Sequence, residues 1–99
     1  MGLKIRLPLK VFRVTDHSME PSIKEGDYVL ASRLHRKLHI GDVVILRHPT
    51  RNIYVIKRVK QLSGGSAFVL GDNSAISEDS RSFGPVKIAT IFGKVIYKV

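Results

Sequence analysis

Short apolar segments separated by turn-forming residues are the feature that most restricts how this chain can fold. Its longest mainly apolar runs, at residues 43–46 and 88–92, have the length of strands and not of long helices. Clusters of Gly, Asp, Asn, Ser and Pro lie between the apolar segments and favour turns. We predict one short helical turn at 20–24. We predict strands over residues 10–15, 27–32, 42–48, 53–62, 66–71 and 88–98.

The length and the strand pattern together predict the fold class. A chain of 99 residues is the size of one domain with a single modest core, so we expect one domain over residues 1–99. Six short strands with little helix indicate a mainly β fold. The arrangement that we expect is a small coiled antiparallel sheet or partly open β-barrel, and not alternating β/α units.

Composition narrows the function classes. The chain has 17 Lys and Arg residues against 8 Asp and Glu, a formal charge of +9, which attracts nucleic acid, anionic lipid or an acidic protein without selecting among them. The lack of cysteine excludes disulfides, thiolate catalysis and Cys-based zinc sites. No apolar run approaches the roughly 20 residues of a membrane helix, and the basic start lacks the apolar core of a signal peptide. From these features we expect a protein that is soluble (cytoplasmic) or peripheral to a membrane.

Lys57 is unusual because it lies within an apolar strand. Period-2 alternation places Lys57 on the same face as Ile53, Val55 and Val59. A lysine in apolar surroundings is desolvated, which lowers its pKa and allows the neutral amine to act as a base. The alternative is a lysine that reaches water along a strand edge.

Three segments carry the functional prediction. They are Ser-Met-Glu-Pro at 18–21, Val-Ile-Lys-Arg-Val at 55–59, and Gly-Asp-Asn-Ser-Ala-Ile-Ser-Glu-Asp-Ser-Arg-Ser-Phe-Gly-Pro-Val at 71–86. In order and local spacing they resemble the conserved boxes of the type I signal peptidases, which are serine-lysine endopeptidases. The resemblance implies an enzyme that removes a leader or signal segment from a protein substrate. It would cleave after a small residue through an acyl-enzyme, with no metal or organic cofactor.

The resemblance also implies three catalytic residues. Ser18 matches the family's nucleophile, and a serine hydroxyl needs a nearby base to remove its proton. Lys57 matches the general base, the role for which a desolvated amine is suited. Ser77 matches the serine that hydrogen-bonds the lysine and orients it.

Further residues match supporting and substrate-binding positions. Asp79 and Arg81 match an ion pair that braces the site, and Arg58 matches a basic neighbour of that pair. Gly and Asn tolerate positive φ, and Asp can close an Asx turn. We therefore expect a tight turn at Gly71, Asp72 and Asn73. The pocket for the small residue before the scissile bond would be lined by Met19 and Ile56, with plain core packing as the alternative.

The sequence departs from the family pattern next to the nucleophile. Asp16 stands where bacterial members often have a serine that helps to hold the oxyanion. A carboxylate aimed at an oxyanion is repulsive, so we expect Asp16 to point away and the N–H of Ser18 to be the donor. His17 is a rival base, but adjacent residues of an extended segment point to opposite sides.

The short interval between Lys57 and Gly71 predicts a minimal catalytic core, because larger bacterial members insert a second β domain there. The resemblance leaves two compact branches open: signal peptidases from which a membrane segment is absent, and soluble maturation peptidases that remove a short leader from one partner, such as those paired with nickel superoxide dismutases. Self-cleaving repressor peptidases generally lack the third segment, which argues against that branch.

A basic binding module on an inactive peptidase scaffold is the main alternative. The basic residues within 32–39 favour an anionic lipid or an acidic partner. Nucleic acid is less favoured, because no nucleic-acid motif is present and only Tyr28 and Tyr54 could stack on bases. The His35 and His39 pair lacks the Glu of a zinc-hydrolase motif. The expected partner is a polypeptide with a cleavable leader, with an anionic membrane surface as a further candidate. The oligomeric state stays open.

Overall fold

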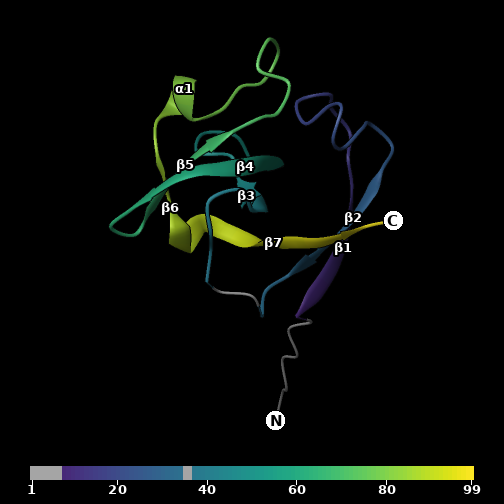
Figure 1. Ribbon diagram of the computed structural model, residues 1–99, viewed down its shortest axis with the longest axis horizontal. Helices are drawn as coiled ribbons and strands as arrows, with labels where there is room; N and C mark the ends of the chain where they lie inside the picture. Colours follow the sequence, from purple (N-terminus) through teal and green to yellow (C-terminus); the bar gives the residue numbers. More distant parts are fainter. Residues whose placement is uncertain (1–7, 35–36) are drawn as a thin grey trace.

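The computed structural model describes residues 8–34 and 37–99, and these form one curled antiparallel sheet of seven strands (Figure 1). The strand order across the sheet is β1-β2-β7-β3-β4-β5-β6, so β1 and β6 form the edges and the last strand, β7, lies between β2 and β3. The elements are β1 (Leu9–Arg13), β2 (Tyr28–Ser32), β3 (Val43–Arg47), β4 (Tyr54–Ser63), β5 (Ser66–Leu70), α1 (Ser80–Phe83), β6 (Val86–Lys87), the 3-10 turn η1 (Ile88–Thr90) and β7 (Ile91–Lys98). The predicted mainly β fold is confirmed.

Local chemistry explains where the structure departs from the predicted elements. Residues 20–24 form turns and no helix, and the one α-helix among the described residues is α1, inside the third segment. Asp79 caps α1 by accepting from the N–H of Arg81, and Gly84, at φ 78°, ends it. Residues 88–90, predicted as strand, form η1, where the chain leaves its pairing with β5 and turns toward β3 and β2.

The hairpin between β4 and β5 holds β4 in register. Gly64 and Gly65 both have positive φ, 50° and 85°, as a two-residue hairpin turn of the right twist requires. Ser63 and Ser66 pair directly across this turn. The hairpin thereby sets which side chains of β4 face each side of the sheet.

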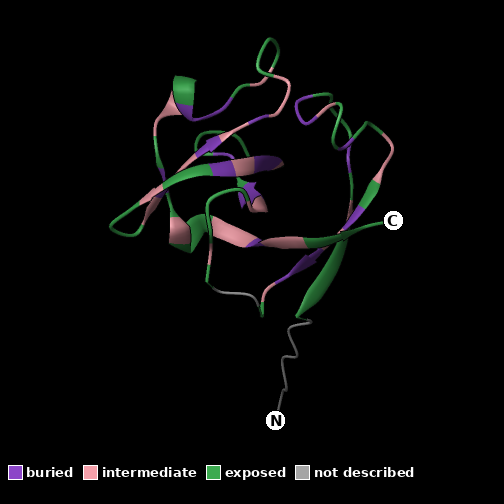
Figure 2. Cartoon of the chain, viewed as in Figure 1, coloured by how far each residue is buried: buried purple, intermediate pink, exposed green. Residues whose placement is uncertain are grey.

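The interior consists of two apolar clusters, one on each face of the curled sheet. Neighbouring residues of β3 alternate between the clusters, because successive strand side chains point to opposite faces. Buried segments accordingly run along β3, β4 and β5 (Figure 2). The first cluster contains Val14, Met19, Ile23, Val29, Ala31, Ile45 and Ile56. The second contains Val44, Leu46, Val59, Ala67, Val69 and Val86.

Leu46 provides a test of this core. Its side chain is fully buried in β3, between β4 and β7. Replacing Leu46 with Ala removes buried apolar contacts and leaves a cavity, so we expect the free energy of unfolding to fall by about 3 kcal/mol. The measurement is urea unfolding followed by circular dichroism. Leu34→Ala is the matched control, because Leu34 is 67% exposed and should cost less than about 0.5 kcal/mol. Equal losses in the two variants would contradict the assigned core.

Candidate active site

Ser18 lies in the loop between β1 and β2, and the third segment is hydrogen-bonded to it. The N–H of Asn73 donates to the carbonyl of Ser18 at 2.8 Å, and the Asn73 side chain donates to the carbonyl of His17 at 3.1 Å. Ser18 itself is only 4% exposed. These bonds join two segments that are more than fifty positions apart in the sequence.

Gly71 is required by close packing and not by its backbone angles. A Cβ at this position would lie 2.6 Å from the Ser18 carbonyl oxygen and would overlap the Ser77 side chain. Its φ is not positive, and no described non-glycine residue, Asn73 included, has positive φ. The expected reason for this turn was therefore wrong, although the segment does lead into the site. Ser18 and Ser77 both contact the same face of Gly71, so the first and third segments meet there.

Lys57 is buried, as predicted from the strand pattern. It lies on β4 opposite Val44 and is 2% exposed. Burial lowers its pKa below the ordinary lysine value, while the carboxylates of Asp16, Asp79 and Glu78 oppose that shift. Within residues 8–34 and 37–99, the side-chain amine of Lys57 forms neither a hydrogen bond nor an ion pair within 4.0 Å. It is a desolvated amine with carboxylates nearby but none in contact.

Asp16 corrects an expectation, because it points toward the nucleophile and not away from it. Its Oδ1 accepts from the Ser18 hydroxyl at 3.0 Å and from the Ser18 N–H at 3.2 Å. This is the local side-chain to backbone bonding, two residues along, that Asp favours in turns. The Ser18 hydroxyl therefore donates to Asp16 and not to Lys57. Because Asp16 also acts electrostatically on Lys57, its carboxylate connects the two residues of the predicted dyad.

The predicted ion pair of Asp79 and Arg81 is present. The guanidinium donates through Nε to Oδ1 at 2.9 Å and through Nη2 to Oδ2 at 3.0 Å, and the N–H of Gly71 donates to Oδ2 at 3.0 Å. Burial alone would raise the pKa of Asp79, but these hydrogen bonds hold it far below its usual range. Ser77 lies close enough to help lower that pKa. Its buried Oγ forms no hydrogen bond with a described residue. The expected bond to Lys57 is therefore not made.

Arg58 has a different partner from the one expected. Its guanidinium binds Asp72 through two bonds of 2.9 and 2.8 Å and donates to the Gly41 carbonyl at 2.8 Å. The hydrogen bond from Arg58 lowers the pKa of Asp72. Arg58 thus ties the start of the third segment to β4 and forms no hydrogen bond with the described Asp79 or Arg81.

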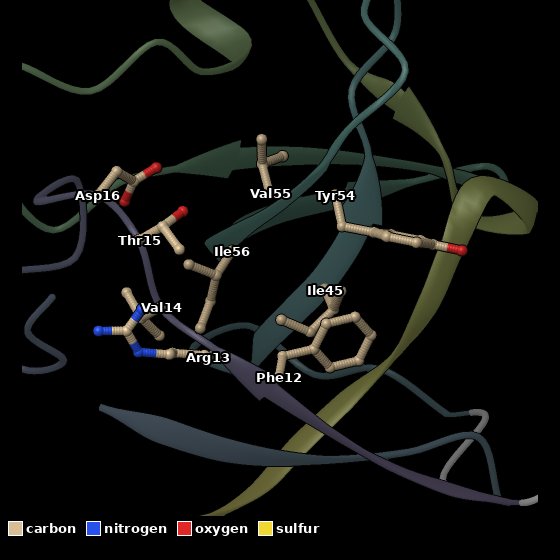
Figure 3. A pocket seen from close by; sticks show the side chains of 9 residues that line it. All are labelled: Phe12, Arg13, Val14, Thr15, Asp16, Ile45, Tyr54, Val55 and Ile56. Carbon is tan, nitrogen blue, oxygen red and sulfur yellow. The ribbon is translucent and has the colours of Figure 1, made fainter. Parts of the chain in front are cut away.

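A pocket of about 50 Å³ opens beside Asp16 (Figure 3). Ile56 lines it and also packs in the first cluster, so the prediction that it contacts the substrate's small residue stays a prediction. Met19 does not line the pocket; it is fully buried in the first cluster, where its sulfur accepts from the N–H of Asp72 at 3.5 Å. Two segments form the walls, the end of β1 with the residues after it and the start of β4. The lining residues are Phe12, Arg13, Val14, Thr15, Asp16, Ile45, Tyr54, Val55 and Ile56.

His48 supports the site and was not identified from the sequence as doing so. It is buried, its Nε2 binds Glu78, and its Nδ1 accepts from the N–H groups of Thr50 and Arg51 at 3.1 Å. The hydrogen bond with His48 lowers the pKa of Glu78. It also attaches Glu78, the residue after Ser77, to the β3–β4 hairpin. The one feature of the sequence that could have indicated this role is the position of His48, a polar ring directly after the buried strand β3.

The remaining histidines do not build a metal site. His17 directs its ring nitrogens to Glu20 and Glu25, away from the role of a base for Ser18, and the hydrogen bond with Glu20 raises its pKa. Of the His35 and His39 pair, which lacks the Glu of a zinc-hydrolase motif, His35 lies outside the described residues. The part of the chain that the structure describes contains no group of three metal-binding side chains.

Comparison with known proteins gives the class. The chain matches the model of the Peptidase S24-like family over residues 3–96 and belongs to that family. It is 32% identical over 106 aligned positions to mitochondrial inner membrane protease subunit 1 of Xenopus tropicalis, covering 83% of this chain and 64% of that protein. It is 35% identical over 109 positions to mitochondrial ATP-independent inner membrane protease subunit 1a of Arabidopsis thaliana, covering 83% and 65%. The resemblance to signal peptidases is thereby confirmed.

The chain spans just under two thirds of the length of these relatives. Within the described ranges, no helix has both the length and the apolar character needed to cross a membrane.

Asp79 provides a test of the site's construction. Asp79→Ala removes the acceptor of four hydrogen bonds, and we expect a loss of about 2–3 kcal/mol in the free energy of unfolding at pH 7. Because the pKa of Asp79 is lower in the folded than in the unfolded state, its charge stabilises the fold above the unfolded value of about 3.9. That contribution is lost as the pH falls toward the folded pKa.

The difference between wild type and Asp79→Ala should therefore narrow from pH 7 to pH 3 in urea unfolding. Glu25→Ala is the control, since Glu25 is half exposed and contacts only His17. A difference that stays constant with pH would show that the charge of Asp79 contributes nothing.

Proposed function

We propose that this protein is a serine endopeptidase in which Ser18 is the nucleophile and Lys57 the general base. The observation that carries the proposal is the state of Lys57, an amine that is 2% exposed, has no described carboxylate in contact and has a lowered pKa. A solvated lysine would stay protonated at neutral pH and could not accept a proton. Its electrostatic coupling to Asp16, which holds Ser18, supports the pairing of the two residues.

Two unpaired strand edges beside the pocket support binding of an extended polypeptide. Among the described strands, β1 pairs only with β2. At the start of β4, residues 54–57 pair only with β3, because β5 joins β4 from Arg58 onward. Both segments line the pocket (Figure 3), and along the chain the first leads to Ser18 and the second to Lys57. A substrate strand added between them would be held by main-chain hydrogen bonds. Its small residue would lie against Ile56.

The chemistry follows from these positions. The Ser18 oxygen attacks the scissile carbonyl carbon while its proton passes to the neutral Lys57 amine. The N–H of Ser18 stabilises the oxyanion once the Asp16 carboxylate has moved from it. The C–N bond then breaks, and the leaving amine takes the proton from Lys57. Water then attacks the ester carbonyl while Lys57 takes its proton, the bond from the carbonyl carbon to Ser18 Oγ breaks, and Lys57 returns the proton to that oxygen. Ser77, beside Gly71 and Asp79, would position the amine. The product released would be a cleavable leader.

The dyad is tested by Ser18→Ala and Lys57→Met. We expect both variants to lose at least about a thousandfold in cleavage, because each removes a group without which the hydroxyl is not activated. Lys57→Met should also hold or raise the free energy of unfolding, since an apolar side chain of similar size replaces a buried amine. The measurement is mass spectrometry of a proteome-derived peptide library after incubation, with unfolding curves beside it. Normal cleavage by Ser18→Ala would refute the proposal, and loss of folding in Lys57→Met would mean that Lys57 serves structure.

Asp16→Asn tests the arrangement at the nucleophile. The change removes a negative charge from the oxyanion donor and supplies an amide N–H, so kcat/KM should rise by about tenfold or more. Asp16 raises the pKa of Lys57, and Lys57 must be neutral to act, so activity rises as pH rises through that pKa. In Asp16→Asn the acidic limb of the profile should move to lower pH. A fall in kcat/KM with an unmoved limb would instead show that the carboxylate is needed to position Ser18.

A further inference from the structure

Three aromatic rings meet at the end of the pocket that lies away from Ser18. They come from Phe12 on β1, Tyr54 on β4 and Phe92 on β7, with edge-to-face contacts and centroids 5.3 to 5.8 Å apart. Phe12 and Tyr54 also line the pocket (Figure 3). A peptide that leaves the pocket at this end would pass over the three rings.

Three cations are held on these rings. Lys10 Nζ lies 5.2 Å from the Phe12 centroid and within 5.8 Å of the other two rings. The Arg33 guanidinium lies 4.8 Å from the Phe92 centroid, and that of Arg47 lies 5.7 Å from the Tyr54 centroid. Attraction between a cation and a ring face fixes the side chain and leaves N–H donors for an anion. We call Lys10, Arg33 and Arg47 the cation cluster.

The cation cluster has no acidic partner among the described residues. Arg47 binds the side-chain amide of Asn52, and none of the three cations has a described carboxylate within 4.0 Å. Five other Lys and Arg residues do form ion pairs: Arg51 with Glu78, Arg58 with Asp72, Arg81 with Asp79, Lys94 with Asp42 and Lys98 with Asp27. Like charges gathered without a counter-ion favour an anion supplied from outside.

The strand geometry gives the distance from the scissile bond. Tyr54 is two residues before Ile56 on β4, and Phe12 is two residues before Val14 on β1, about 7 Å in each case. Lys10 is two residues further along β1. A substrate whose small residue lies against Ile56 would have its third residue before the scissile bond at the rings and its fifth at Lys10.

We propose that the cation cluster binds a carboxylate side chain of the substrate, located three to five residues before the scissile bond. This rests on the proposed function, because it takes the leader to be the part that fills the pocket. Continuity with the pocket favours an acidic peptide over an anionic membrane, since a bound leader would cover the rings that hold the cations. The site would thus select leaders with Asp or Glu upstream of a small residue.

The test uses peptides that are identical except for Glu, Gln or Lys at the fifth position before the cleaved bond. We expect the Glu peptide to have a KM about tenfold below that of the Gln peptide, with kcat unchanged. Lys10→Gln/Arg47→Gln should remove that difference and leave the Gln peptide unaffected. Lys87→Gln is the control, because Lys87 is exposed on β6 at the opposite edge of the sheet and should keep the preference.

A binding measurement separates the two proposals. Fluorescence anisotropy with the Ser18→Ala protein reports peptide affinity without cleavage, so preference for the Glu peptide would support the cation cluster even if wild type cleaved nothing. Equal affinity for Glu and Gln peptides would overturn this inference and leave the dyad unaffected. Vesicles of phosphatidylcholine with 30% phosphatidylglycerol test the other source of anions. Binding to them that is lost in Lys10→Gln/Arg47→Gln, with no preference among the peptides, would assign the cluster to a membrane and overturn the inference.

Discussion

The buried carboxylate of Asp79 is the interaction on which the site's construction depends. A charge in this position is stable only because donors surround it, and they come from Gly71 at one end of the third segment and Arg81 in α1. The same carboxylate caps α1. With the segment closed on itself in this way, Gly71 lies flush against Ser18 and Ser77, and only a residue without a side chain fits there.

Two opposing effects act on the pKa of Lys57. Burial on β4 disfavours its charge, whereas carboxylates at a distance moderate that effect without neutralising it. An amine in this state costs stability, and perturbed pKa values of this kind are common at functional sites. Asp16 affects both residues, because it opposes the lowering of the Lys57 pKa and accepts from the hydroxyl of Ser18. The edges of β1 and of the start of β4 have no partner strand among the described residues, so they leave hydrogen-bonding capacity unused.

Most of the fold could be predicted from local pattern. Alternation of apolar residues and turn chemistry located six strands within a few residues, because each depends on near neighbours in the chain. The errors have two different causes. Residues 88–90 turn because the chain changes strand partners there, and that cause has no local signal. The helix α1 has local signals, Asp79 at its N-cap and Gly84 at its end, but a helix of four residues is too short to show apolar periodicity.

The sequence by itself determined that Lys57 would be desolvated and that Ser18 and the third segment belong to one peptidase-like site. Only the tertiary structure decided where the polar side chains point: Asp16 onto Ser18, Arg58 onto Asp72 and His48 onto Glu78. The physical reason is the range of the forces involved. Burial of a strand face follows from periodicity along a few residues, whereas a hydrogen-bond partner depends on which loops meet, and that is settled when the whole sheet has curled.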